Sequence, residues 1–336
     1  MPIKKILSGV VVLLLLACGF LYCQKHRTIT VPVLMYHKFG SAGSDVWTMD
    51  LKEFRRDLAS FSAQGYKTIL PKDLAANKKW GRPLPSKPMI ITMDDGHIGV
   101  TNAEVLLKEY GYKAIVYLIT DMTASNDAAR FSWNGAPCLI WDEVKAIESR
   151  GVLSFGGHSA SHANLASLAD PSEEIRRCFN DLRRNLGHKP DSFCYPFNQY
   201  NPRVVAAMTG SRFTTGMAGS DTVAVISAAD DMFKIARVSV FGGDKSFRLS
   251  KVSEGVKPEK VLLHYKGPPM DVSVRIKADG FFLRMQFRKL AGDGAELLDT
   301  DLPAGIKELE VEVWDKHGII HHYSGCLKLE ASEIVK

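Results

Sequence analysis

The sequence has few of the patterns that define several protein classes. Its 336 residues include only six cysteines, no two of them in a C-x-x-C spacing, so a cysteine-ligated zinc site or a thioredoxin-like motif is not supported. The sequence has no low-complexity linker and no convincing internal repeat. Its composition, 46% hydrophobic and 24% charged, excludes disorder, collagen and coiled coil. Because only one long apolar run is present, a protein with several membrane spans is excluded too.

An excess of positive charge is also lacking over most of the chain. The formal net charge is +6, but Lys4, Lys5, Lys25 and Arg27 lie in the first 30 residues, which contain no acidic residue. Beyond residue 30 the chain has 39 basic residues against 37 acidic ones. A chain with this balance lacks the charge that binds nucleic acid, so we expect no nucleic-acid partner.

The one long apolar run lies at the N-terminus, where 18 uncharged residues extend from Ile6 to Cys23 after two lysines. This arrangement predicts an export signal within residues 1–29, and its length also suits a membrane anchor. The segment Leu15–Cys18 resembles a bacterial lipobox, in which Cys18 would carry the lipid after cleavage. The alternative is an uncleaved single anchor. In both cases we expect the bulk of the chain to lie outside the cytoplasm, attached to the membrane only through this segment.

Short apolar segments alternate with amphipathic helical patterns from Pro32 to about Gly243. They are bounded by turn or polar residues, as buried parallel strands are. The expected strands are residues 33–39, 89–93, 114–119, 152–155, 192–197, 212–217 and 235–240. Helices are expected from Asp50, over 100–110, over 141–149 and from Asp170. The alternation predicts an α/β fold, a (β/α) barrel of about seven strands over residues 30–250.

The last part of the chain, residues 258–336, has a different pattern. Apolar residues alternate with polar ones at Val272, Val274 and Ile276, and again from Leu309 to Val313, while Asp-Gly and His-Gly pairs supply hairpin turns. This pattern predicts a small all-β domain, a sandwich.

Two of the expected barrel strands end in residues that suit metal chemistry. The strand over 89–93 runs into Asp94, Asp95 and Gly96, and the strand over 152–155 is followed by His158 and His162. In a parallel barrel the carboxyl ends of the strands form the active site, so these side chains are expected to meet. One carboxylate and two imidazoles leave open positions on a cation, as a catalytic site requires.

Three segments of the sequence have the order and the spacing of motifs in a known enzyme family. Thr92–Gly96, His158–His162 and Tyr195–Phe197 resemble the first three motifs of the polysaccharide deacetylase (NodB-type) family. The opening Val33–His37 and the stretch Tyr195–Asn201 are similar to its exported poly-N-acetylglucosamine deacetylases. The resemblance covers roughly residues 30–245 and implies a distorted barrel that removes acetyl groups from N-acetylated sugars with the help of a metal.

The resemblance also implies roles for individual residues. Asp95, His158 and His162 would bind a divalent ion, zinc in the first instance, with cobalt and nickel as alternatives. Asp94 would act as general base on a water activated by the ion. The third motif would supply substrate contacts and an oxyanion-binding N–H near Phe197; its residues are Tyr195, Pro196, Phe197, Asn198 and Tyr200.

One feature departs from the family pattern, and the general acid has two candidates. Many members have an arginine before the proline of the third motif, where it steadies the base, but this sequence has Cys194 and Tyr195 there. Arg237, on the last expected barrel strand, either faces the site or is a surface charge. The general acid usually comes from a late Leu-x-His, which His264 fits, while His37 after the first strand is the other candidate for the acid or for the pocket.

The expected function is therefore an extracytoplasmic metal-dependent de-N-acetylase of a polysaccharide that contains N-acetylglucosamine. The enzymatic alternatives are an O-acetyl esterase or a peptidoglycan deacetylase of the same fold. The non-enzymatic alternative is a surface carbohydrate-binding protein with a degenerate barrel. A partnership with polymer-export machinery is compatible with each of these.

Overall fold

The computed structural model describes residues 28–41, 45–220, 222–227, 229–242, 246–252, 260–267, 269–279, 281–290, 294–298 and 308–328. The N-terminal apolar run and Cys18 lie outside these residues, so the export signal and the lipid anchor stay predictions. In the described ranges, no helix has the length and the apolar character needed to cross a membrane.

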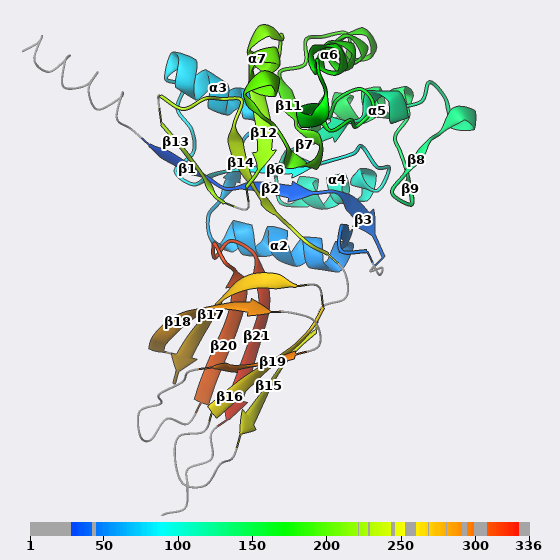
Figure 1. Ribbon diagram of the computed structural model, residues 1–336. Coiled ribbons are helices and arrows are strands. Elements are labelled where there is room, and N and C mark those ends of the chain that lie inside the picture. Colours follow the sequence, from blue (N-terminus) through cyan, green and yellow to red (C-terminus); the bar gives the residue numbers. More distant parts are fainter. Residues whose placement is uncertain are drawn as a thin grey trace, which may run out of the picture.

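Seven parallel strands close into a barrel (Figure 1). Their order around the ring is β2, β14, β12, β11, β10, β7 and β6, and β6 pairs again with β2. The strands are β2 (Val33–Tyr36), β6 (Pro88–Met93), β7 (Ala114–Leu118), β10 (Leu153–Gly157), β11 (Ser192–Cys194), β12 (Thr215–Gly219) and β14 (Ile235–Ser239). Each overlaps a segment where the sequence predicts a strand, and β6 shows why: all six of its residues are buried. The α/β barrel is confirmed.

Six helices of the described chain accompany the barrel strands: α2 (Leu51–Ala63), α3 (Pro71–Trp80), α4 (Val100–Glu109), α5 (Trp141–Ser149), α6 (Ser172–Leu186) and α7 (Pro202–Gly210). The four expected helices are present, and Asp50 caps α2 through a bond from the Lys52 N–H to Oδ1 (2.7 Å). Helices α3 and α7 were not anticipated, because each buries only two side chains and so has a weak apolar stripe. Both begin with a proline, a start signal that the sequence did offer.

Short elements surround the barrel. Strand β5 (Lys67–Thr68) extends the sheet beside β6. Three two-stranded pairs are β1 (Ile29–Val31) with β13 (Ala224–Ile226), β3 (Lys38–Gly40) with β4 (Thr48–Asp50), and β8 (Ser132–Trp133) with β9 (Ala136–Pro137). Single 3₁₀ turns cover Thr120–Met122, Asp127–Ala129, Leu165–Ser167 and Pro196–Asn198.

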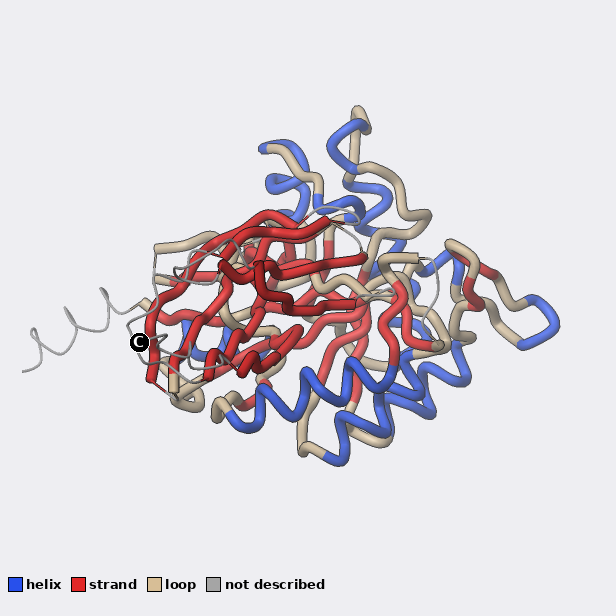
Figure 2. Tube along the Cα trace, turned by 90° about the horizontal axis from the view of Figure 1, so that it is seen from below, coloured by secondary structure: helices blue, strands red, loops and turns tan. Residues whose placement is uncertain are grey.

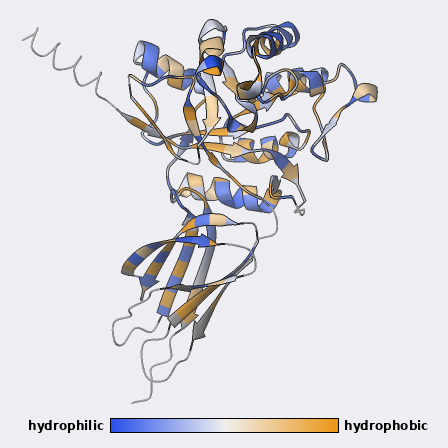
Figure 3. Ribbon diagram, in the orientation of Figure 1, coloured by the Kyte–Doolittle hydropathy of each residue, from blue (hydrophilic) through white to orange (hydrophobic). Residues whose placement is uncertain are grey.

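The C-terminal part is a sandwich of two antiparallel sheets. One contains β15 (Ser246–Val252), β16 (Lys260–Lys266) and β19 (Gly294–Leu298). The other contains β17 (Met270–Ala278), β18 (Phe281–Leu290), β20 (Glu308–Asp315) and β21 (His321–Lys328). Their inward residues share one core, and the strands show alternating polar and apolar bands (Figure 3). The expected all-β domain is confirmed; the expected barrel boundary at residue 250 falls inside β15, which pairs with β16.

The sandwich contacts the barrel through α2 and the turn between β20 and β21. Ile319 and Ile320 of this turn belong to the barrel's core cluster, and Gln64 donates from Nε2 to the carbonyl of Ile319 (3.2 Å). Figure 1 shows α2 between the barrel and the sandwich, and Figure 2 shows the helices at the periphery of the strands. Because β14 leads directly toward β15, the sandwich is attached at the carboxyl end of a barrel strand.

Gly156 lies in a part of the barrel wall that has no room for a larger side chain. A Cβ added at Gly156 would lie 2.6 Å from the carbonyl oxygen of Ser192 and 2.7 Å from the Tyr117 ring. We expect Gly156→Ala to lower the free energy of unfolding by about 1–3 kcal/mol, because the added methyl overpacks the wall. The matched control is Gly210→Ala, whose added Cβ has no atom within 4 Å and whose stability should not fall. Urea denaturation measures both, and equal loss in the two variants would contradict the explanation.

Candidate metal and catalytic site

The turn after β6 directs two adjacent carboxylates to different neighbours. Asp95 and Gly96 both have left-handed backbone angles, with φ of 73° and 75°. Glycine suits the second position because an added Cβ would lie 2.6 Å from Cδ2 of Leu118. The turn therefore leaves Asp94 facing the barrel interior and brings Asp95 beside the histidines that follow β10.

His158 and His162 meet Asp95 as the sequence predicts. The Nε2 atoms of the two histidines lie 3.5 Å and 3.6 Å from Oδ1 of Asp95. Their rings are 4.8 Å apart, centroid to centroid, at 69° to each other. Ser159 and His162 take positive φ values of 60° and 63°, so a tight loop, and not a helical turn, brings the two rings together.

The loop that carries the two histidines is held from behind by helix α6. Glu174 accepts hydrogen bonds on Oε2 from the N–H groups of Ala160 (3.1 Å) and Ser161 (2.9 Å), and on Oε1 from the Ser161 hydroxyl (3.0 Å). A carboxylate near the start of a helix is also favoured by the helix dipole. Glu174 thus fixes the loop on one side, while the carbonyl groups of Ser159 and Ala160 accept hydrogen bonds from the N–H groups of Thr120 (3.4 Å) and Asp121 (2.9 Å).

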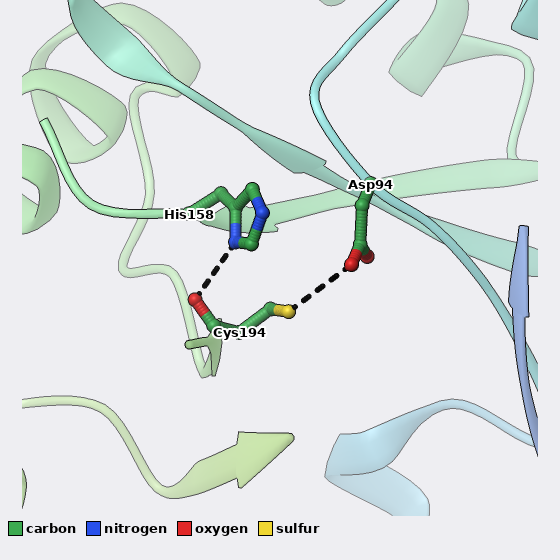
Figure 4. Close-up of side chains that lie close together, drawn as sticks. All are labelled: Asp94, His158 and Cys194. Atoms are coloured by element: carbon green, nitrogen blue, oxygen red, sulfur yellow. Dashed lines mark hydrogen bonds between the residues drawn. The ribbon is translucent and has the colours of Figure 1, made fainter. Parts of the chain in front are cut away.

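The three side chains fit a divalent cation. One oxygen of Asp95 and one nitrogen each of His158 and His162 lie within 4.8 Å of one another, and all three groups are largely buried. Nδ1 of His158 lies 2.9 Å from the carbonyl oxygen of Cys194 (Figure 4). This contact leaves Nε2 of the ring directed toward Asp95. Mixed nitrogen and oxygen donors of this kind suit zinc and similar ions.

Asp94 is paired with Arg237, a residue that enters from β14. Nη1 of Arg237 donates to Oδ1 of Asp94 (2.7 Å) and Nη2 donates to Oδ2 (2.8 Å), and the arginine is fully buried. The same guanidinium donates to Oγ1 of Thr92 (3.1 Å) and Oδ1 of Asn198 (2.8 Å). Cys194, where the family pattern has arginine, has its sulfur 3.4 Å from Asp94 (Figure 4). A cation therefore steadies Asp94, but from a different strand.

These surroundings change the pKa values of the central groups. Burial by itself raises the pKa of Asp94, but Arg237 and His158 outweigh it, so that the pKa lies well below its ordinary value. Burial lowers the pKa of His37. Burial, reinforced by His158, lowers the pKa of His162 to about 4. Asp94 is consequently ionised and His162 neutral at neutral pH, the states that a base and a metal ligand need.

These residues open into a cavity of about 400 Å³. His37 lies in its wall, with its ring 4.5 Å from that of Trp47 and its buried Nδ1 without a hydrogen bond. The lining residues are Met35, His37, Lys38, Trp47, Asp94, Asp95, Asn134, His158, His162, Tyr195, Phe197 and Asn198.

The third motif forms a 3₁₀ turn at the cavity edge. Phe197 and Asn198 both have φ of 57°, and the Phe197 ring is 58% exposed and 4.6 Å from the ring of His162. Tyr195 is buried and donates its hydroxyl to the Phe233 carbonyl (2.8 Å), while Tyr200 stacks on it at 5.4 Å. The turn thus combines an exposed ring with a buried anchor.

Other candidates lie farther from the cavity. His264 is on β16 in the sandwich, where it pairs across the sheet with Ala295, and it does not line the cavity. Conversely, no sequence motif marks Lys38 or Asn134, which meet at the cavity through a hydrogen bond from Nζ of Lys38 to the Asn134 carbonyl (2.9 Å). Trp47, which also lines the cavity, was not predicted either, because the segment around it contains no recognisable motif.

Comparison with known proteins agrees with the fold. Residues 81–215 match the model of the polysaccharide deacetylase family. YxkH of Bacillus subtilis, whose name describes it as a polysaccharide deacetylase, is 24% identical to this chain over 239 residues. These residues are 70% of this chain and 80% of YxkH. The match confirms the resemblance drawn from the three motifs.

Solved structures of low sequence identity share the barrel. The deacetylase PplD of Streptococcus pyogenes superposes with a TM-score of 0.56 at 20% identity, covering 64% of this chain and 94% of PplD. IcaB from Ammonifex degensii gives 0.55 at 20% identity, covering 63% of this chain and 91% of IcaB. These likenesses concern the fold, and each covers less than two thirds of this chain.

The contribution of the Arg237–Asp94 pair to stability can be tested by removing the arginine. We expect Arg237→Met to lower the free energy of unfolding at pH 7 by about 3–5 kcal/mol, because it leaves a buried carboxylate without its cation. Without Arg237, burial raises the pKa of Asp94, so the loss should shrink as the pH falls and Asp94 takes up a proton. Urea denaturation at pH 7 and pH 5 measures both effects.

The control is Arg55→Met, which removes an exposed arginine paired with Glu109 and should change stability little at either pH. A loss at Arg237 that does not depend on pH would contradict an electrostatic role.

Proposed function

We propose that this chain, which carries a polysaccharide deacetylase domain over residues 81–215, is an extracytoplasmic, metal-dependent de-N-acetylase of a polysaccharide that contains N-acetylglucosamine. The observation that supports this most directly is the convergence of Asp95, His158 and His162 beside the ionised Asp94 in one cavity. This arrangement favours an enzyme over a degenerate binding protein, because it provides both a candidate metal site and a candidate base.

The residues divide the chemistry of amide hydrolysis between them. Asp95, His158 and His162 would hold the divalent ion, zinc in the first instance, whose Lewis acidity lowers the pKa of a nearby water and polarises the acetyl carbonyl. Asp94 accepts the proton of the attacking water. Arg237 keeps Asp94 ionised and, through two parallel hydrogen bonds, holds the carboxylate in one orientation.

His37 is the general acid in this proposal. Hydrolysis of an amide leaves an amine, which needs a proton as the carbon–nitrogen bond breaks. His37 lies in the cavity wall, and its Nδ1 is buried without a hydrogen bond. Burial lowers the pKa of the ring and the charges of Asp94 and Asp95 partly offset this, so the protonated ring is a stronger acid than a free imidazolium. His264 lies on β16 and does not line the cavity, so the late Leu-x-His that resembles the family motif is not favoured for this role.

Exposed aromatic rings at the cavity support a sugar substrate. Trp47 is 37% exposed and Phe197 is 58% exposed, and both line the cavity. Large rings are exposed elsewhere on the described surface too, as Trp80 is at 68%, so the support comes from the position of these two rings at the cavity, where the faces of sugar rings can stack on them. An acetylated polymer could lie along these rings with one acetamide group at Asp94.

The proposed location depends on the N-terminal run. Residues 6–23 would direct export, and Cys18 would hold the chain at the membrane if the segment resembling a lipobox is processed. An enzyme anchored in this way would be placed to work beside polymer-export machinery.

The third prediction tests the reaction itself. The full chain, purified in a mild detergent, should release acetyl groups from N-acetylglucosamine oligomers, and a chelator should abolish the release. Asp94→Asn should lower kcat by about 10²- to 10⁴-fold because it removes the base. Mass spectrometry of the oligomers measures the loss of acetyl groups.

The control for this experiment is Asp121→Asn, whose carboxylate accepts bonds from Arg177 and does not line the cavity. If wild-type protein with bound zinc removes acetyl groups only from O-acetylated sugars, the de-N-acetylase proposal is wrong and the esterase replaces it.

The fourth prediction separates the two histidines proposed as the acid. We expect His37→Gln to lower kcat by about 10²- to 10⁴-fold with a smaller effect on KM, because proton donation acts in the transition state. His264→Gln should leave both constants close to those of the wild type. Steady-state kinetics on one oligomer measures both variants, and the opposite ranking would transfer the role to His264.

A further inference from the structure

A buried histidine next to the candidate metal site has no role in the chemistry above. His97 is 1% exposed, and neither of its ring nitrogens makes a hydrogen bond. Burying a polar ring without partners is costly, so such a group in a native protein calls for an explanation. The polar group that its ring approaches is the carboxylate of Asp95, with Nε2 of His97 3.4 Å from Oδ2.

The two oxygens of Asp95 have different neighbours. Oδ1 faces the Nε2 atoms of His158 and His162, at 3.5 Å and 3.6 Å, while Oδ2 faces His97. A carboxylate can turn about its terminal bond, which would exchange the two oxygens or tilt both away from the histidines. A donor on the side of Oδ2 restricts this rotation and leaves Oδ1 directed toward the ion.

The backbone holds His97 in this place. The left-handed turn at Asp95 and Gly96 reverses the chain, so that the side chain two residues later returns to Asp95. On either side of His97, the carbonyl of Gly96 accepts from the N–H of Leu139 (2.9 Å), and the N–H of Ile98 donates to the carbonyl of Pro137 (2.9 Å). His97 itself forms a β-bridge with Cys138. The ring therefore sits on a rigid support.

We propose that His97 is a positioning residue of the metal site, which donates from Nε2 to Oδ2 of Asp95 and so directs Oδ1 toward the ion. The inference rests on the proposed function, because it requires that Asp95, His158 and His162 bind a metal. The contact of 3.4 Å is long for a hydrogen bond, and contacts of this kind shorten when a site is filled. His158 has a comparable support in the Cys194 carbonyl, so two of the three proposed ligands would be held from behind.

The test measures zinc binding without any substrate. Metal-free full chain is titrated with Zn²⁺ against a chromogenic chelator of known affinity. We expect His97→Phe, which keeps the ring volume and removes the donor, to weaken zinc binding by about 10- to 100-fold, as the loss of an outer-shell partner does. His97→Gln, whose Nε2 can reach the position of the imidazole Nε2, should stay within about threefold of the wild type because it restores the hydrogen bond.

A second pair keeps the test decisive if the phenylalanine variant does not fold. His97→Asn has the same amide group on a shorter side chain, so it should bind zinc more weakly than His97→Gln, while thermal unfolding of the two metal-free proteins should be alike. His188→Gln, at a half-exposed histidine bonded to Glu148, is the control and should bind zinc as the wild type does.

Zinc binding distinguishes a failure of the role of His97 from a failure of the metal site itself. Equal zinc affinity of the wild type, His97→Phe and His97→Asn in folded protein overturns the role of His97 and leaves the metal site intact. A wild-type chain that binds no Zn²⁺ overturns both. The absorption spectrum of bound Co²⁺ gives an independent readout: a ligand field changed in His97→Phe and restored in His97→Gln supports the role, and three identical spectra oppose it.

Discussion

The site depends on a buried ion pair between a carboxylate at the end of β6 and a guanidinium from β14. Asp94 and Arg237 are both removed from water, and two hydrogen bonds join them. Either charge alone would be strongly unfavourable there, so the pair ties together the strands on which it lies. Since β2 lies between β6 and β14 in the ring, the barrel must close around β2 before the two groups can meet.

The same pair explains how two adjacent aspartates acquire different roles. Asp94 faces a permanent cation that favours its ionised form, whereas Asp95 faces imidazoles that can share a metal with it. The left-handed turn at Asp95 and Gly96 is the local feature that separates their directions. The proposed roles of base and ligand therefore follow from the partners that the fold brings to each carboxylate.

Sequence patterns predicted the parts of the molecule that depend on near neighbours. Buried strands appear as short apolar runs, so all seven barrel strands could be located, and the alternation in the tail indicated the sandwich. Asp94, Asp95, His158 and His162 were found because each follows a strand end. Helices α3 and α7 were missed because they bury few residues, and the first sandwich strand was missed because β15 follows the barrel without a break in composition.

The sequence by itself thus determined the strand order along the chain, the residue types at each strand end and the family likeness, because these depend on local periodicity and spacing. Only the tertiary structure decided which residues meet. Arg237 is 143 residues from Asp94, and the sequence left open whether it faces the site or is a surface charge. The sequence offered both His37 and His264 as candidates for the general acid. In the structure His37 lines the cavity, whereas His264 lies in the sandwich. Barrel closure and the turns at the carboxyl ends of the strands determine which side chains meet, because they bring residues that are distant in sequence within hydrogen-bonding reach.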